Sequence, residues 1–420
     1  MNIHFIKKGF FLFFLWQKFL FSVEILVPMD ESQKDHLKVY GLVYRAIEKG
    51  IKAKILLNYR GGSFVLSDNS FIREFIALNS LTFESFEDED RKILQKKIET
   101  ENIDEIEFEK APKIAIYKPQ TTEPWDDAVT MALEYADIPY AQLWDKEVLT
   151  GELQKYDWLH LHHEDFTGQY GKFYAFAKNM QWYQSRRLVF EEMAKSMGYK
   201  RTADQKRDVA LAIQKYVAEG GFLFAMCSAT DTLDIALSAQ HVDIVDTLID
   251  QTPITPDFQN LLKYEYTFAF ENYKVFPDPY LYEFSDIDIN PQAEGILQNK
   301  KFFTLFDFNA HIDPIPSLLT QNHQREIADF LGQTTAFRLD KIKPRVLILA
   351  QSLGTSRVKY IYGGYKNGFF SFYAGHDPED YQHLVGDPPT NLSLHKNSAG
   401  YRLILNNILL PAAKKKKKKT

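Results

Sequence analysis

The sequence predicts an α/β fold built around a doubly wound, mostly parallel sheet. Two observations predict it. The chain opens with a β-α-β pattern, in which short apolar strands at 24–30 and 54–57 flank an amphipathic helix at 32–49. Further along, residues 220–231 have the pattern of an apolar strand, a sharp turn and a helix, with Cys227 at the turn. In folds of this class, ligands bind at the carboxyl ends of the strands.

The composition is that of a soluble protein with a large core. The chain has 420 residues, 45% of them hydrophobic, and a formal net charge of -6. That length accommodates several domains or one elaborated α/β domain. The modest charge predicts no nucleic-acid partner. The single cysteine excludes an intramolecular disulfide and a cysteine-rich zinc site.

Residues 1–23 have the features of a signal peptide or an N-terminal membrane anchor. Lys7 and Lys8 precede an apolar run at 9–16, and a second apolar run follows at 19–23. The run is short and interrupted for a membrane span. We therefore expect an exported protein, periplasmic or membrane-associated, and any membrane association would be through this segment.

Residues 24–240 form the first part of the predicted α/β core. The helix at 32–49 ends at Gly50, a residue type that favours helix termination. The Gly-containing loop at 58–64 lacks the spacing of a phosphate-binding loop, so turn formation is its expected role. We expect a charged surface excursion at 83–110, strands at 113–117 and 156–163, a strand–helix passage at 144–153, and helices at 125–136, 182–197 and 203–218.

An aromatic-rich insertion at 241–300 divides the core. Pro253, Pro256, Pro277 and Pro279 punctuate its aromatic stretch, and we expect the insertion to be β-rich. Residues 301–413 then form the second part of the core. Its expected elements are strands at 301–308 and 344–350, a short helix at 324–331, a hairpin at 358–373 and a last helix at 399–410. A solvated basic tail at 414–420 follows.

Cys227 is the first candidate catalytic residue. It lies where an apolar strand ends and a helix begins, and free N–H groups at a helix N-terminus favour a thiolate. Acyl-transfer enzymes place their nucleophiles on such an elbow. The alternative is a small buried hydrophobic residue, the commonest role of a free cysteine.

Two groups of histidines end predicted strands, on the edge where Cys227 is expected. His162 and His163 close the strand at 156–163, and His376 follows the hairpin. A cysteine nucleophile needs a base and an orienting carboxylate. We therefore predict Cys227 as nucleophile and His376 as base, oriented by Glu379 or Asp377.

The surrounding polar residues form a predicted substrate-binding side. Its members are His162, His163, Glu164, Asp165, Tyr170 and Asp231, although Asp231 could instead cap the helix after Cys227. The same histidines and acids have the residue types of a metal site. Adjacent residues of a regular strand face opposite ways, which argues against His162 and His163 sharing an ion. A hydrogen-bond network that braces loops is the third alternative.

Three passages resemble the class I glutamine amidotransferase-like superfamily. They are GGFLFAMCSATD at 220–231, YDWLHLHHEDFTGQYGKF at 156–173 and FYAGHDPEDY at 372–381. The last two are most similar to the ThuA-like branch, where a Gly-His pair ends a late strand. The resemblance implies a flavodoxin-like, mostly parallel sheet of the class I glutamine amidotransferase type with a β-rich insertion. It departs from that pattern at Ala225 and Ala229, which replace elbow glycines, and at Glu379, which lies three residues after His376 instead of two.

Nearly the whole chain also resembles bacterial proteins labelled asparagine synthetase B, through stretches such as LLNYRGGSF and DPEDYQHLVGDP. Position 2 is Asn, and neither an SGG-x-DS loop nor a P-loop occurs, so ATP-dependent asparagine synthesis has no visible machinery.

The leading functional hypothesis is therefore Cys-dependent amide hydrolysis or acyl transfer. The substrate would be a small amide or a carbohydrate-like molecule, and no cofactor or metal is predicted. One alternative is a noncatalytic or carbohydrate-binding envelope protein of ThuA-like fold that uses Trp158, Trp182 and Tyr170 as aromatic platforms. A second alternative is a metal-assisted hydrolase. The sequence pattern does not indicate whether the chain is a monomer or an oligomer.

Overall fold

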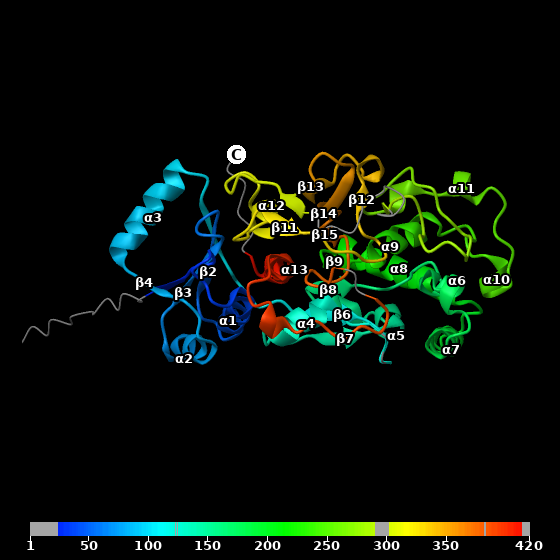
Figure 1. Cartoon of the computed structure of the whole chain (residues 1–420), viewed down its shortest axis with the longest axis horizontal. Helices are drawn as coiled ribbons and strands as arrows, with labels where there is room; N and C mark the ends of the chain where they lie inside the picture. The colour runs from blue at the N-terminus through cyan, green and yellow to red at the C-terminus, as the bar shows by residue number, and fades with distance from the viewer. Residues whose placement is uncertain (1–23, 122, 124, 290–301, 382–383, 414–420) are drawn as a thin grey trace, which may run out of the picture.

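A computed structural model describes residues 24–121, 123, 125–289, 302–381 and 384–413 (Figure 1). The predicted leader at 1–23, the basic tail at 414–420 and the end of the predicted insertion at 290–300 lie outside the described residues. Export therefore stays a prediction. Among the helices of the described ranges, none is long and apolar enough to cross a membrane.

The N-terminal unit is built on a five-stranded sheet in the order β4-β1-β3-β2-β5, with every neighbouring pair antiparallel. Strands β1 and β2 both pair antiparallel with β3, so they run in the same direction, as the predicted β-α-β unit requires, but β3 lies between them and the expected parallel pairing is wrong. The reason lies in the turn after β2, where Asn58, Arg60, Gly61 and Gly62 have positive φ angles and send the chain straight back into β3. The strands are β1 Glu24–Val27, β2 Ala53–Leu57, β3 Ser63–Ser67, β4 Glu84–Phe86 and β5 Asp104–Glu107.

Three helices accompany this sheet: α1 His36–Glu48, α2 Ser70–Asn79 and α3 Asp88–Thr100. Helix α1 confirms the helix predicted at 32–49, and it begins where the Asp35 side chain accepts a hydrogen bond from Lys38 N–H. The region at 83–110, predicted to be a surface excursion, instead supplies both edge strands and α3.

The second sheet is mixed. Its order is β11-β10-β13-β14-β15-β9-β8-β6-β7, with β12 paired to β14. Among the described strands, four pairings are parallel and five are antiparallel. The chain is thus α/β, but a mostly parallel sheet is not found. The antiparallel half arises because short connections, such as the hairpin between β14 and β15, return the chain beside itself. The strands are β6 Ile114–Tyr117, β7 Ala141–Leu143, β8 Trp158–Leu161, β9 Phe222–Met226, β10 Phe302–Leu305, β11 Glu326–Ala328, β12 Phe337–Arg338, β13 Leu347–Gln351, β14 Arg357–Tyr365 and β15 Gly368–Tyr373.

Helices cover both faces of the parallel half. Alternate residues of β6 enter different cores: Ile116 packs with α4 and α13, whereas Tyr117 packs with α8 and α9. The remaining helices are α4 Ala128–Tyr135, α5 Asp145–Leu149, α6 Tyr174–Ala177, α7 Gln181–Ser196, α8 Thr202–Ala218, α9 Ala229–Ser238, α10 Thr247–Asp250, α11 Phe258–Leu261, α12 Pro314–Leu319 and α13 Ala399–Leu409.

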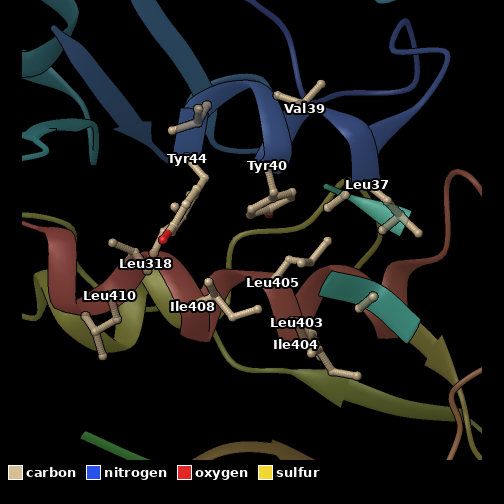
Figure 2. Packing of buried hydrophobic residues seen from close by; sticks show 14 of the residues in the cluster. Leu37, Val39, Tyr40, Tyr44, Leu318, Leu403, Ile404, Leu405, Ile408 and Leu410 are labelled. Carbon is tan, nitrogen blue, oxygen red and sulfur yellow. The ribbon is translucent and has the colours of Figure 1, made fainter. Parts of the chain in front are cut away.

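Helices α1 and α13 join the two sheets (Figure 2). Tyr40 and Tyr44 of α1 face Leu405 and Ile408 of α13, and all four side chains are buried. The buried Arg402 of α13 donates to the carbonyl oxygen of Met29 at 2.9 Å, in the N-terminal unit. This apolar joint with a satisfied charge fixes the N-terminal unit against the mixed sheet.

The predicted β-rich insertion is wrong over its described part. Residues 241–289 contain the short helices α10 and α11 and isolated bridges, but no strand of either sheet. Prolines remove ladder donors from this segment, and Asp234 of α9 instead accepts the N–H groups of Phe268, Ala269 and Phe270 at 2.6–2.9 Å. The helix predicted at 324–331 is also wrong, because β11 pairs with β10 there.

Candidate functional site

The parallel strands direct several polar residues to one edge of the mixed sheet. Asp126 and Asp127 follow β6, His162 follows β8, Cys227 follows β9, and His376 follows β15. The strand order reverses between β6 and β8, because β7 lies on one side of that pair and β9 on the other. Open α/β sheets bind ligands in the crevice at such a reversal.

Three imidazoles converge at this edge, and we name His162, His163 and His376 the histidine cluster. One ring nitrogen from each residue lies within 4.8 Å of the other two. The rings of His162 and His163 stack with centroids 4.0 Å apart, and Nε2 of His163 lies 2.6 Å from Nε2 of His376. Residues 214 positions apart in the chain, His162 and His376, thus belong to one site.

The cluster is buried on one side and reachable on the other. His162 and His376 are 1% and 2% exposed, whereas His163 is partly exposed. Both ring nitrogens of His162 are buried; Nδ1 faces the Asp127 carboxylate at 3.4 Å, whereas Nε2 has no hydrogen-bond partner among the described residues. Buried polar groups without partners are uncommon and frequently mark a ligand or ion position.

Asp127 lies behind the cluster. It caps α4 by accepting a hydrogen bond from Thr130 N–H at 2.8 Å. Its carboxylate oxygens lie 3.4 Å from Nδ1 of His162 and 3.5 Å from Nε2 of His160. Burial alone would raise the pKa of Asp127, but the neighbouring imidazoles hold it well below its ordinary value. Asp127 therefore stays ionised and can orient His162.

The chain leaves the regular strand before the cluster begins. Strand β8 ends at Leu161, and the N–H of His162 donates to Oε2 of Glu164 at 2.7 Å instead of to a neighbouring strand. The strand alternation used to separate His162 from His163 therefore does not apply, and the two rings share one side. That argument against a shared ion is wrong.

Glu164, Asp165 and Tyr170 shape the loop that follows the cluster. Burial raises the pKa of Glu164 to about 8. Asp165 accepts hydrogen bonds from Thr167 N–H and Gly171 N–H, at 2.8 and 2.9 Å. Tyr170 is buried, has a φ of 53°, and places its hydroxyl near Thr202 and Glu191. These three residues hold the loop in shape, and Glu164 also ties it to the histidine cluster through the hydrogen bond that it accepts from His162 N–H.

Cys227 occupies the elbow that the sequence predicts. It lies between β9 and α9 with a φ of 49°, a conformation that ordinary residues adopt only under constraint. The thiol is buried and accepts a hydrogen bond from Gln333 N–H at 3.4 Å. Burial raises its pKa to about 11. Over the described ranges, no hydrogen bond joins this thiol to an imidazole.

The contacts described for Glu379 and Asp377, the predicted orienting carboxylates, are with residues other than Cys227 and His376. Glu379 forms an ion pair with His395, with Oε2 and Nδ1 3.0 Å apart, beside a surface hollow of about 500 Å³. Asp377 accepts a hydrogen bond from Glu379 N–H at 2.8 Å. Asp231 accepts one from Thr334 Oγ1 at 3.1 Å, and burial raises its pKa well above the ordinary value. No triad of Cys227, His376 and a carboxylate is therefore assembled by the described contacts.

A group of aromatic side chains, Trp125, Phe173 and Trp182, packs beside the histidine cluster, and both tryptophans are partly exposed. The Trp125 ring lies 5.4 Å from His163, and it also contacts Phe173 and Trp182. Of the three platforms suggested by the sequence, Trp158 and Tyr170 are buried, and only Trp182 is partly exposed. Trp158 stacks beneath His160 and Phe224 in the core.

Sequence reasoning missed Asp127 and Trp125 as parts of the site. Both lie in the passage 124–131, which follows a strand predicted correctly at the same sheet edge. The sequence feature that could have identified them is a polar segment directly after a parallel strand, where ligand-binding residues are expected. The pairing of β6 with β8, which brings Asp127 to His162, is a property of the folded sheet.

Comparisons with known proteins give distant likenesses only. No protein-family model and no curated protein matches the sequence. Two solved structures of cytoplasmic proteins from Salmonella typhimurium, STM3548 and STM1381, each match 72% of this chain and 100% of their own, with TM-scores of 0.35 and sequence identities of 11% and 14%. A GH42 beta-galactosidase, Gan42B, matches 63% of this chain and 27% of its own, with a TM-score of 0.27 and 10% identity. Scores of this size carry no functional argument.

Proposed function

We propose that this chain is a hydrolase that acts on a small amide or ester, with its site at the histidine cluster. The observation that carries the proposal is the convergence of His162, His163 and His376 within 4.8 Å at the carboxyl edge of the parallel strands. Hydrolysis of an acyl carbon needs an activated water molecule. A lone pair on an imidazole nitrogen either accepts the water's proton or holds an ion that acidifies the water.

The surroundings of the cluster suit this role. The partly exposed His163 is the member that a substrate meets first, and Trp125 beside it offers an apolar ring face. Asp127 holds a negative charge behind His162, which would stabilise positive charge that develops on the imidazoles during proton transfer. As the water oxygen bonds to the acyl carbon, its proton passes through the cluster to the leaving amine or alcohol.

We also propose that the parallel half of the mixed sheet is flavodoxin-like, of the class I glutamine amidotransferase type. Its strand order β7-β6-β8-β9-β15 corresponds to the second, first, third, fourth and fifth strands in chain order within that half. This is the flavodoxin-like order. The elbow at Cys227 and the histidine after the last parallel strand support the same assignment.

Cys-dependent acyl transfer is the second candidate. The observation in its favour is the constrained elbow itself, since φ at Cys227 is 49° and a helix N-terminus follows. The elevated pKa of the thiol and its hydrogen bond from Gln333 N–H favour a buried, protonated thiol instead. The two candidates use neighbouring strand ends, so one set of variants separates them.

The test is hydrolysis of a panel of chromogenic nitrophenyl esters and nitroanilides by the purified chain. We expect His376→Ala and His163→Ala to lower kcat/KM by about 10²- to 10⁴-fold, the usual contribution of an acid–base group. Cys227→Ser should keep kcat/KM within about threefold of the parent. His395→Ala is the matched control, because it removes an imidazole outside the cluster.

Two results would contradict this assignment. Loss of turnover in Cys227→Ser with retention in His163→Ala would favour the thiol candidate. Absence of turnover across the whole ester and anilide panel would remove the hydrolase proposal.

A further inference from the structure

We propose that the histidine cluster binds one divalent transition-metal ion of the zinc class through ring nitrogens of His162, His163 and His376. What the ion does rests on the proposed hydrolysis, whereas its binding rests on geometry alone. The donors belong to two segments, the turn after β8 and the segment after β15. The site is therefore assembled by the fold.

The first observation is a crowding of acceptors around His163. Its Nε2 lies 2.6 Å from Nε2 of His376 and 3.0 Å from the carbonyl oxygen of Asp126. A neutral imidazole has one N–H and one lone pair, so a proton on Nε2 of His163 can point toward only one of these two neighbours. A cation among these atoms would be attractive to all three at once.

The second observation is independent of the first and concerns His162. Its ring is 1% exposed, Nδ1 faces the Asp127 carboxylate, and Nε2 has no hydrogen-bond partner among the described residues. Leaving a buried polar atom unsatisfied costs about 1–3 kcal/mol. One of these nitrogens lies within 4.8 Å of nitrogens of His163 and His376. A metal ion would occupy that nitrogen's lone pair.

Asp127 has the position of an orienting residue. Its carboxylate faces Nδ1 of His162 at 3.4 Å, which would keep the proton on Nδ1 and leave the Nε2 lone pair for the ion. Histidine ligands of metals commonly hydrogen bond a carboxylate through their other nitrogen. The carboxylate of Asp126 lies 3.9 Å from Nε2 of His376 and adds negative charge beside the same point.

The donor set selects the class of ion. Imidazole ligands suit Zn²⁺, Co²⁺, Ni²⁺ and Cu²⁺, whereas Mg²⁺ and Ca²⁺ require mostly oxygen ligands. Two nitrogens on one tetrahedral zinc ion lie about 3.3 Å apart. His163 and His376 would therefore separate by about 0.7 Å from their present 2.6 Å, which the partly exposed His163 can accommodate. Three protein ligands leave the fourth position for a water molecule, the arrangement of catalytic zinc sites.

The experiment is direct metal binding to the full-length chain, stripped with a chelator and then titrated with zinc chloride alone. We expect one zinc ion per chain, and visible absorption typical of tetrahedral cobalt when cobalt chloride replaces zinc. His163→Ala should weaken zinc binding at least about 100-fold, more than the usual loss of an orienting residue. This variant is chosen because a partly exposed side chain can be truncated with little effect on folding, which circular dichroism checks.

Two further variants sharpen the assignment. Asp127→Asn keeps the helix cap, because Asn caps as well as Asp, but removes the charge behind His162. It should weaken zinc binding about 10- to 100-fold while the tetrahedral cobalt spectrum is retained. His395→Ala, which lies outside the cluster, should bind zinc like the parent.

The experiments distinguish failure of the metal-site proposal from failure of the hydrolase proposal. Absence of stoichiometric zinc binding, or equal binding by the parent and His163→Ala, overturns the metal site and leaves a direct imidazole–imidazole hydrogen bond between His163 and His376. Hydrolysis that survives complete chelation also overturns it as a catalytic ion. Zinc binding without turnover of any ester or anilide supports the metal site and removes the proposed hydrolysis.

Discussion

The elbow at Cys227 and the histidine cluster lie at neighbouring strand ends and differ in every respect that matters for chemistry. The thiol of Cys227 is buried and accepts a hydrogen bond from a backbone N–H, and its raised pKa favours the protonated form. The histidine cluster has one partly exposed ring and, in Nε2 of His162, a buried nitrogen without a hydrogen-bond partner among the described residues. A suggestive backbone conformation is therefore weaker evidence for reactivity than a convergence of three imidazoles that includes such a nitrogen.

A separate pair of histidines shows that proximity of two imidazoles is not by itself evidence for a functional site. His36 and His323 stack at 4.1 Å in the joint between the N-terminal unit and α13. Nδ1 of His36 lies 3.0 Å from the side chain of Asn397, and Nε2 lies 3.0 Å from the carbonyl of Met29. Both nitrogens of His36 are therefore satisfied by the protein itself, and we assign His36 a structural role.

The largest expected effect on stability concerns the loop at 329–336, whose Gln333 N–H donates to the Cys227 thiol. Asp329, at the start of this loop, is buried and pairs with Arg357 at 3.0 Å and Lys359 at 2.8 Å. Asp329→Ala would leave two buried cations without a counter-charge, so we expect a loss of about 3–5 kcal/mol in the free energy of unfolding. Urea denaturation measures it.

The matched control is Asp340→Ala, which removes a carboxylate from an exposed pair with Arg338. Exposed pairs contribute about 0–1 kcal/mol. A loss in Asp329→Ala no larger than in the control would show that the loop at 329–336 is not anchored by this network.

The next effect is on the reactivity of the thiol. With its pKa raised from 9.0 to about 11, the Cys227 thiol would be ionised roughly 100-fold less often near neutral pH than an unshifted cysteine, and burial limits access further. We expect iodoacetamide to label the native chain at least about 100-fold more slowly than the urea-unfolded chain. Mass spectrometry over a time course measures this ratio. Equal rates would restore Cys227 as a candidate nucleophile.

A smaller effect is expected at the stacked pair of His36 and His323. Burial lowers the pKa of His36 to about 4 and that of His323 to about 3, from an ordinary value of 6.5. Below pH 6.5 the unfolded chain binds protons that the folded chain resists, so the free energy of unfolding falls as the pH is lowered toward 4. We expect a loss of up to about 3 kcal/mol from each histidine at pH 4, since each unit of pKa difference is worth about 1.4 kcal/mol and solvent screening reduces the effect at the partly exposed His323.

Urea denaturation of the parent and of His36→Gln at a series of pH values, from about 7.5 down to about 4, tests this. This range spans the ordinary pKa of histidine and the lowered pKa of His36. The variant should be less stable at neutral pH but should lose less stability on acidification. A slope equal to that of the parent would mean that the acid sensitivity lies elsewhere.

The smallest effect separates the predicted triad from the observed contacts. Glu379 pairs with His395, and both side chains are roughly one-third exposed, so Glu379→Ala should change stability by about 0–1 kcal/mol. In the nitrophenyl ester assay its kcat/KM should stay within about threefold of the parent. A loss near that of His376→Ala would reinstate Glu379 as an orienting carboxylate.

Local patterns predicted most helices and the central strands. The strand at Phe222–Met226, the turn at Cys227 and the helix that follows were all readable, because apolar runs and helical spacing are properties of short segments. The strand pairing was not readable, since the left-handed turn at Asn58–Gly62 returns the chain as β3, which pairs between β1 and β2 and separates the two strands of the expected parallel pair. Edge strands such as β4 and β11 carry too few apolar residues to be recognised.

The site was predicted in its members but not in its connections. His162, His163 and His376 were all singled out, because each follows a strand of the same edge. Their grouping depends on the end of β8 at Leu161, which a hydrogen bond to Glu164 produces, and on the long passage from β9 to β15. The ion pair of Glu379 with His395 is likewise a contact of the folded chain that no local sequence pattern indicates.

The most direct measurement is an anomalous difference map at the zinc edge, from crystals of the full chain soaked in zinc chloride. A thiolate is a good zinc ligand, so the soak lets the elbow and the histidine cluster compete for one ion. We predict a peak about 2.0–2.1 Å from ring nitrogens of His162, His163 and His376, with none at Cys227. A peak at the Cys227 sulfur, or an empty histidine cluster, would contradict the account.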